Sequence, residues 1–229
     1  MRSRARRALA AATALVAAVT MASCGGGPAV TPTPAVANDP VPAPTELETF
    51  YYQDIHWYPC GEKGGMQEAD ADTGPGTFSC ARVTVPLNYD EPGGATIELA
   101  LKRRSASGTS IGSLFINPGG PGGSGIELVE SAGSYFSKNL TSSYDVVGFD
   151  PRGVGASTAV DCLTDAELDA ERAGANDPAT PSAAATQERA QKMGEACAAK
   201  TSPAGLLDHI DTISAAKDLD ILRAVDGQQ

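Results

Sequence analysis

Apolar and polar positions alternate in blocks along this chain, and the clearest block joins a short apolar run to a helical pattern through a glycine-rich turn. The apolar run extends from Leu114 to Ile116, and residues 117–125 hold five glycines and two prolines. Four further residues recur at helical spacing after this turn: Ile126, Val129, Gly133 and Phe136. The pattern predicts a strand, a loop with exposed backbone and a helix, in that order.

A second buried strand follows the predicted helix. Residues 144–150 are mostly apolar, and residues 151–157 form another glycine-punctuated loop. A strand, a helix and a strand within about 35 residues are typical of a βαβ unit, whose two strands are parallel. Ligands of such sheets bind outside the carboxyl ends of the strands. Both glycine loops are therefore predicted to face one crevice, and the open edge of the sheet is expected beside residues 144–150.

Two strands are predicted before this unit. Residues 81–87 are centred on Val83 and Val85, and residues 95–103 alternate apolar and polar side chains, as a half-buried strand does. Turn-forming residues lie between them, at 88–94. We expect an antiparallel hairpin that leads into the βαβ unit, so the predicted fold class is α/β with a mainly parallel sheet.

The C-terminal part of the chain is predicted to be helical. Residues 161–201 are rich in Ala, Glu and Asp but carry only a thin apolar stripe, so two helical pieces are expected to form an excursion over the sheet. A stronger amphipathic helix covers residues 213–225, with Asp211 or Thr212 as its N-cap.

Residues 1–23 have the form of a secretory signal peptide. Four arginines precede an alanine-rich apolar stretch that is too short for a comfortable transmembrane helix. Small residues then lead to Cys24 in a pattern that resembles a bacterial lipobox. Residues 24–45 hold six prolines and are interpreted as an extended tether. The sequence predicts an exported domain at 46–229, attached to the extracellular face of the cell membrane by a lipid on Cys24; ordinary cleavage and secretion is the alternative.

Charge limits the partners of this domain. The formal net charge of −11 becomes −15 without the signal peptide, because residues 1–23 hold four arginines and no acid. Nucleic acid requires a basic protein face, so it is not expected as a partner. The charge also opposes adsorption to anionic lipid, so membrane attachment would come from the lipid anchor.

Four cysteines remain when Cys24 is set aside. An even number in an exported chain indicates two disulfides. The sequence permits three pairings, of which Cys60–Cys80 with Cys162–Cys197 is the most local. Zinc is the alternative, but no CxxC spacing or nearby histidine supports it, and no metal is expected.

Two serines lie in patterns like the nucleophile elbow of hydrolases. Ser110 stands in a literal G-x-S-x-G at residues 108–112, but that motif requires a strand before the serine and a helix after it. Here the serine lies between two predicted strands, so we interpret it as a chance match. Ser157 is a weaker imitation of the motif. His56 lies close to Asp54, and we assign it a surface or packing role.

Residues 120–125 also match G-x-G-x-x-G, the dinucleotide-binding pattern. An acid, Asp145 or Asp150, follows about 20 to 25 residues later, as that pattern requires. Against this interpretation, Pro121 removes an amide from the phosphate cradle and Pro118 distorts its approach. A dinucleotide-binding fold therefore remains a lesser alternative.

An oxyanion loop is the third interpretation of the same glycines. In α/β-hydrolases the loop after the third strand is glycine-rich and supplies one amide to the tetrahedral oxyanion. Residues 117–125 and 150–157 together resemble the proline iminopeptidase and tripeptidyl aminopeptidase group of α/β-hydrolases, whose secreted actinobacterial members are often lipoproteins. The lead-in at residues 80–89 resembles that group too, so the similarity runs over nearly the whole mature chain.

The resemblance implies a serine exopeptidase, or a related amidase or esterase, that acts on peptides without a metal or organic cofactor. Carried over by position, Gly120 supplies the oxyanion amide, and Gly119 and Gly122 shape the turn. The second loop supports the site and is ordered through hydrogen bonds of Arg152. The residues assigned to this support are Asp150, Arg152, Gly153 and Gly155.

The triad of this group is not found in the sequence. The nucleophile elbow should follow the helix at 213–225, on the next strand, but the sequence ends at Gln229. His209 is no substitute, because the chain order in the fold is Ser, Asp, His. We therefore expect an N-terminal portion of an α/β-hydrolase that is inactive alone, with a separately encoded C-terminal half as one candidate partner. The alternative from another class is a non-catalytic surface lipoprotein that binds peptides or wall fragments.

Overall fold

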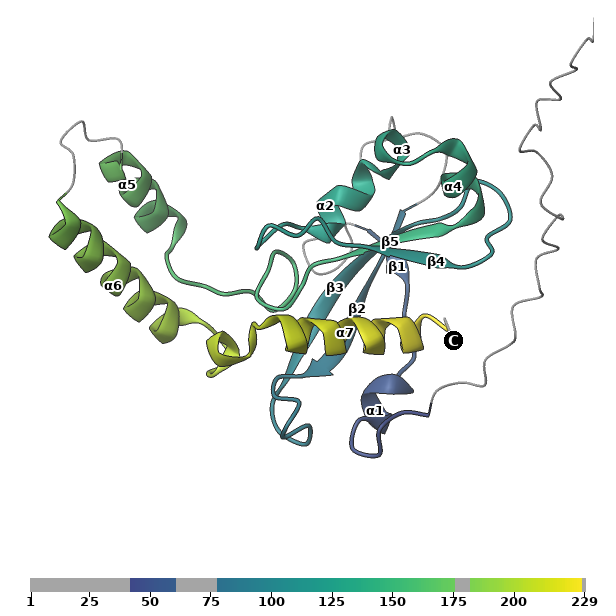
Figure 1. The fold of residues 1–229 in the computed structure, drawn as a ribbon, viewed down its shortest axis with the longest axis horizontal. Coiled ribbons are helices and arrows are strands. Elements are labelled where there is room, and N and C mark those ends of the chain that lie inside the picture. Colours follow the sequence, from purple (N-terminus) through teal and green to yellow (C-terminus); the bar gives the residue numbers. More distant parts are fainter. Residues whose placement is uncertain (1–41, 61–77, 176–181, 228–229) are drawn as a thin grey trace, which may run out of the picture. The chain divides into compact units, whose positions relative to one another are not determined.

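The computed structural model describes residues 42–60, 78–175 and 182–227 (Figure 1). All described residues belong to one compact unit, Asp39–Gln229. The predicted signal peptide, Cys24 and nearly all of the tether lie outside the described residues.

Five strands form one sheet in the order β1-β2-β3-β5-β4. Their bounds are Tyr58–Pro59 (β1), Phe78–Pro86 (β2), Thr96–Arg104 (β3), Ser113–Ile116 (β4) and Asp145–Phe149 (β5). The predicted hairpin is β2–β3, and the predicted parallel pair is β4–β5. The other pairings among the described strands are antiparallel, so this sheet is mixed and mostly antiparallel rather than mainly parallel. The reason is that these residues contain a single crossover, and three strands precede it.

The edge strand beside the parallel pair is β4, not the strand at residues 144–150. Figure 1 shows β5 between β3 and β4, in agreement with the register, in which Leu101 lies opposite Phe149 and Ile116 opposite Gly148. The sequence prediction of the open edge was therefore wrong. Chain order does not reveal which side of β4 the returning strand takes, whereas pairing with β3 removes one exposed edge from the sheet.

Both faces of the sheet are covered. On one face, helix α7 (Thr212–Val225) packs against β2 and against the short helix α1 (Glu48–Tyr51). The core on this face consists of Phe50, Ala81, Val83, Val85, Leu87, Ile97, Leu99, Leu101, Val147, Phe149, Leu206, Ile221 and Leu222. On the other face, α2 (Gly125–Glu130) packs against β3 and β5.

The second half of β3 is buried on both faces, although its alternating sequence predicts one polar face. Lys102 is fully buried and donates to Glu130 of α2, and Arg104 is 1 % exposed. Burial lowers the pKa of Arg104 because the charged form loses its hydration. Residue alternation identifies the two faces of a strand but does not show that a helix covers the second one.

The single helix expected after the glycine loop is divided into three. Helix α2 ends at Glu130, α3 spans Ala132–Tyr135 and α4 spans Lys138–Ser143. Ser131 caps the end of α2, and its amide donates to Leu128 O at 3.1 Å. Serine and glycine at residues 131–134 are weak helix formers, so the apolar spacing alone does not sustain a continuous helix.

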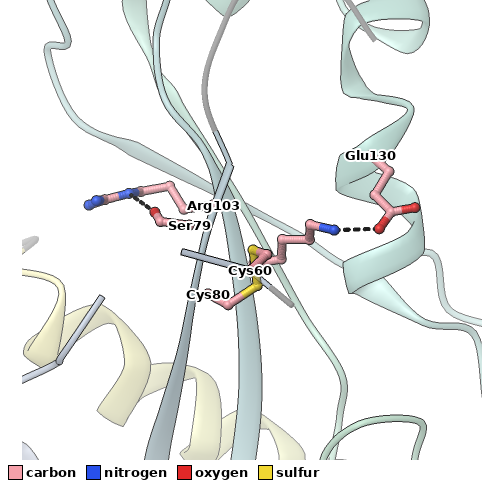
Figure 2. The surroundings of a disulfide bond; sticks show 6 residues. Cys60, Ser79, Cys80, Arg103 and Glu130 are labelled. Carbon is pink, nitrogen blue, oxygen red and sulfur yellow. Dashed lines mark hydrogen bonds and ion pairs between the residues drawn. A yellow bond between two sulfur atoms is a disulfide. The ribbon is translucent and has the colours of Figure 1, made fainter. Parts of the chain in front are cut away.

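Two disulfides are present, and they are the most local of the three pairings: Cys60–Cys80 and Cys162–Cys197. The Cys60–Cys80 bond joins the residue that follows β1 to β2 (Figure 2). The loop at residues 61–76, which this bond closes, lies outside the described residues.

The excursion at residues 161–201 consists of α5 (Asp165–Ala175) and α6 (Ala183–Lys200). Its two ends meet at the Cys162–Cys197 bond and at Thr201, whose hydroxyl donates to Asp161 O and accepts from Asp161 N. No residue of α6 is buried, which agrees with the thin apolar stripe.

Helix α7 begins as predicted. Asp211 is its N-cap and accepts from Ile213 N at 2.8 Å and from Ser214 N at 3.0 Å. A short 3-10 helix, η2 (Leu206–His209), precedes it. Over residues 42–60, 78–175 and 182–227, no helix has both the length and the apolar character needed to cross a membrane.

Candidate active site

A cleft of about 360 Å³ lies where the two glycine loops meet the start of α7. The glycine loop contributes Asn117, Gly119, Gly120, Pro121 and Gly122; the second loop contributes Pro151, Arg152 and Val154; the third wall contributes Ile210, Asp211, Thr212 and Ala215. The prediction that both loops face one crevice is therefore confirmed. The third wall was not predicted, because its residues are about 60 positions further along the chain.

The glycine loop is folded on its own backbone. Asn117 Oδ1 accepts from Gly119 N at 2.9 Å, and Gly123 N donates to Gly119 O at 3.0 Å. Pro121 has no N–H. The amides of Gly120 and Gly122 therefore remain, and neither has an acceptor in the described part of the chain.

Gly120 has a backbone conformation that other residues rarely adopt. Its φ is +135°, and a Cβ atom there would lie 3.0 Å from Gly123 N and 3.1 Å from Gly122 N. A side chain at this position would displace the amides that line the cleft.

Asp150 follows β5, and its carboxylate is hydrogen-bonded to both loops. Its carboxylate is 1 % exposed and accepts from Ser124 Oγ at 2.7 Å, from Ile126 N at 3.3 Å and from Ala156 N at 2.8 Å. Gly155 lies against it at φ +55°, where a Cβ atom would be 2.2 Å from Asp150 Oδ2. The carboxylate is thus held by neutral donors from both loops.

Arg152 uses all five of its N–H donors inside the protein. Two bonds reach Asp218, at 2.8 Å from Nε to Oδ2 and 2.6 Å from Nη2 to Oδ1. The other three reach the carbonyl oxygens of Leu87, His209 and Pro86, at 2.9, 3.0 and 3.1 Å. Arg152 therefore ties the second loop to the end of β2, to the wall before α7 and to α7 itself.

Asp218 and Tyr89 complete this network and were missed by the sequence analysis. Tyr89 donates to Asp218 Oδ1 at 2.8 Å, and burial, helped by the negative charge of Asp218, raises its pKa, so the phenol stays neutral. One signal was available: Asp218 lies three and four residues before the buried Ile221 and Leu222, on the apolar face of α7. An acid on that face requires a buried partner.

Gly153 pairs with Ala159 in an isolated bridge and lies beside Ile210 of the third wall. Its φ is +82°, and a Cβ atom there would approach the Ile210 side chain to 3.0 Å. The four residues that were predicted to support the site, Asp150, Arg152, Gly153 and Gly155, therefore all hold the second loop in place beside the cleft.

Neither elbow-like serine pairs with a histidine within the described residues. Ser157 is 6 % exposed, donates to Asp150 O at 2.6 Å and accepts from Ala100 N at 2.8 Å. Ser110 is exposed in the loop between β3 and β4, and its hydroxyl donates to Gly112 O at 3.1 Å. Both hydroxyls serve the backbone, and neither lines the cleft.

The acids that the dinucleotide pattern requires are engaged elsewhere. Asp145 is the first residue of β5, at the opposite end from the cleft loops, and accepts from Ala106 N at 2.7 Å. Asp150 is enclosed by its three donors. Neither Asp145 nor Asp150 lines the cleft beside the glycine loop. Among the described residues, no group of three His, Cys, Asp or Glu could hold a metal ion.

Comparison with known proteins identifies relatives of the chain. The serine protease Hip1 of Mycobacterium tuberculosis is 38% identical over 177 residues, which are 76% of this chain and 33% of that protein. Carboxylesterase B of the same species is 39% identical over 150 residues, 64% of this chain and 29% of that protein. A tripeptidyl aminopeptidase of Streptomyces coelicolor is 38% identical over 164 residues, 68% of this chain and 29% of that protein.

No protein-family model matches the chain. The chain spans about a third of the length of the curated relatives it matches. The matched portion is nevertheless most of this chain, and the relatives agree in being hydrolases, two of them peptidases by name. Over that portion, the chain is similar to these relatives in a way that is consistent with an α/β-hydrolase peptidase group.

Proposed function

We propose that this chain supplies the oxyanion-binding part of an exported serine hydrolase that cleaves peptide or amide bonds, as a tripeptidyl or prolyl aminopeptidase does. The observation that best supports this is the pair of amides at Gly120 and Gly122, which line the cleft without an acceptor among the described residues. The match to a serine protease and to a tripeptidyl aminopeptidase supports the same reaction class.

Fixed N–H donors in a cleft suit acyl transfer. When a nucleophile attacks a peptide carbonyl, the oxygen gains negative charge, and such donors stabilise that charge more than the neutral carbonyl. Removing one donor from a known hydrolase lowers kcat by about 10²–10³. We assign this role to Gly120 because its position in the loop matches the oxyanion residue that the resemblance implies; the Gly119 amide is already bonded to Asn117, and Pro121 has no amide. This chemistry requires no metal and no organic cofactor.

The serine, acid and histidine are proposed to come from polypeptide outside these 229 residues. The relatives are longer, and β4 lies at one edge of the described sheet. A groove of about 360 Å³ beside it is lined by Phe115, Ala216, Leu219, Asp220 and Arg223. A further parallel strand on β4 would end at the sheet edge where the cleft lies. The proposed partner is a C-terminal half, encoded with this chain or separately, and the chain alone is inactive.

Export and anchoring belong to the same proposal. Residues 1–23 would direct export, Cys24 would carry the lipid, and residues 24–45 would hold the domain away from the extracellular face of the membrane. Metabolic labelling with a radioactive fatty acid tests this: Cys24→Ala should abolish the label and release the protein into the medium.

Reconstitution tests the catalytic proposal. The full chain alone should not hydrolyse a chromogenic tripeptidyl substrate, whereas co-expression with the region encoded downstream of residue 229 should. In the reconstituted enzyme, Gly120→Ala should lower kcat by about 10² or more. The control is Gly93→Ala, because a Cβ atom at Gly93 meets nothing within 4 Å. Hydrolysis by the chain alone that Ser110→Ala abolishes would refute the assignment.

A second function, a non-catalytic lipoprotein that binds peptides or wall fragments in the cleft, is supported by one observation. The described residues contain a cleft but no serine bonded to a histidine. Calorimetric titration of the full chain with short peptides, together with cooperative unfolding as a monomer, would favour it. An aggregating product with an unpaired β4 edge would favour the hydrolase fragment.

A further inference from the structure

The Asp150 carboxylate is buried without a cationic partner in the described part of the chain. It is 1 % exposed, and no lysine or arginine within the described residues pairs with it. Its charge is stabilised by the Ser124 hydroxyl of the glycine loop, by the Ile126 amide of α2 and by the Ala156 amide of the second loop. A buried charge held only by such bonds depends strongly on each of them, because its hydration has been lost.

Ser124 is the donor that joins the glycine loop to this carboxylate. Its hydroxyl donates to Asp150 Oδ1 at 2.7 Å and accepts from Glu127 N at 3.1 Å as the N-cap of α2. A hydroxyl has one proton, so donation to Asp150 orients its lone pairs toward the first turn of α2. Ser124 therefore fixes both the start of α2 and its position relative to β5.

The backbones beneath this contact are too close to shift past one another. A Cβ atom on Gly148 would lie 2.0 Å from Gly125 O, and one on Gly125 would lie 2.1 Å from Phe149 O. The start of α2 thus lies directly against β5, with no side chain between them. A displacement of Ser124 must be taken up by the loop that precedes it.

That loop carries the free amides of the cleft. Gly122 is two residues before Ser124, and the Gly123 N to Gly119 O bond closes the turn between them. At the other side of the carboxylate, the bond from Ala156 N holds the loop that contributes Pro151 and Val154 to the cleft. Two walls of the cleft, the glycine loop and the second loop, are therefore held by hydrogen bonds to the same buried carboxylate, that of Asp150.

We propose that Ser124 and Asp150 are positioning residues that set the orientation of the Gly120 and Gly122 amides relative to the second loop. This inference rests on the proposed function for its catalytic meaning. Its structural content, however, is measurable on the full chain without any hydrolysis.

The experiment compares Ser124→Ala with Ser137→Ala by amide hydrogen exchange. Ser137 is a matched control, because it also caps a six-residue helix and accepts from Leu140 N but has no carboxylate partner among the residues that the structure describes. Ser124→Ala should accelerate exchange of the Gly123 amide about ten- to hundredfold, the range expected when a hydrogen bond to a charged group is lost. The Leu87 amide, in the β2–β3 hairpin, should keep its rate.

Two further variants separate positioning from simple loss of stability. Ser124→Thr retains a hydroxyl and should restore slow exchange at Gly123. Asp150→Asn leaves the side-chain shape and should accelerate exchange at Gly123 and Ala156 together, because both loops share that carboxylate. Equal acceleration at Gly123 and Leu87, no change at Gly123, or the same effect from Ser137→Ala would overturn the proposal.

A kinetic arm connects the pair to catalysis. In the reconstituted enzyme, Ser124→Ala should lower kcat at least tenfold with little change in KM, since the oxyanion forms only in the transition state. If Ser124→Ala accelerates amide exchange at Gly123 but the reconstituted preparation never hydrolyses the substrate, the proposed function is wrong and the positioning role stands. If the reconstituted enzyme is active but Ser124→Ala changes neither kcat nor the exchange rate of the Gly123 amide, only the positioning role is refuted.

Discussion

Replacing Asp218 by alanine tests how strongly the buried network behind the cleft holds the fold. The side chains of Arg152 and Asp218 are each 1 % exposed, and they share two hydrogen bonds. The substitution leaves a guanidinium inside the protein with two unused donors, and it removes the acceptor of Tyr89. The three carbonyl partners of Arg152 remain but carry no charge.

The expected cost follows from this burial. Breaking a buried pair by removing one partner costs about 3–5 kcal/mol, because the other charge is left uncompensated. That is a large part of the roughly 5–15 kcal/mol that stabilises a typical domain. For a domain of this size it corresponds to a fall in Tm of about 6–20 °C.

Asp220→Ala is the matched control. Asp220 lies on the same helix, accepts from a tyrosine, Tyr51, at 2.7 Å and pairs with an arginine, Arg223, but its side chain is 48% exposed. Water replaces the lost partners there, so the control should cost about 1 kcal/mol or less. The two variants differ mainly in burial.

Urea unfolding of the full chain measures both variants. Trp57 is the single tryptophan, packs against the main core and stacks on Arg103 at 4.2 Å, so its fluorescence reports on the fold. A double variant, Arg152→Met with Asp218→Leu, should lower the free energy of unfolding by less than the sum of the losses caused by Arg152→Met alone and Asp218→Leu alone, because it removes both charges. The reasoning is refuted if Asp218→Ala costs no more than Asp220→Ala.

Three further predictions concern single positions. Gly155→Ala should destabilise by about 2–4 kcal/mol in urea unfolding, since its Cβ would lie 2.2 Å from Asp150 Oδ2 at φ +55°, whereas Gly93→Ala should change stability by less than about 0.5 kcal/mol; equal effects would contradict the contact. Gly194→Ala, inside the exposed helix α6, should stabilise that helix by up to about 1 kcal/mol, measured as helicity and Tm by circular dichroism, and a loss would show that Gly194 has an unseen packing role. Hydrogen bonds that Asp211 accepts from Ser214 hold the pKa of Asp211 at about 2, below its ordinary value of 3.8. Its contribution to the free energy of unfolding is therefore present above pH 4 and is lost as the pH falls toward 2. Asp211→Asn should flatten the dependence of stability on pH in that window and leave the slope above pH 5 unchanged.

The sequence by itself determined the elements whose causes are local. The glycine turn after an apolar run predicted a strand, loop and helix start. The cap of α7 was predicted to be Asp211 or Thr212, and Asp211 is the one whose carboxylate accepts from the next amides. The two disulfides are the pairings with the shortest separations, 20 and 35 residues. That both loops share a cleft also followed from the sequence, because the carboxyl ends of parallel strands meet at one edge.

The tertiary structure decided what depends on distant partners. Local pattern could not show that β5 lies inside the sheet, since strand order is set by which edge gains hydrogen bonds. It could not show that Asp218 pairs with Arg152, which is 66 residues away, or that Lys102 is buried against α2. The orientation of the Gly120 amide likewise depends on a carboxylate beneath the loop. Buried charges need partners wherever the chain brings them together, and only the folded arrangement identifies those partners.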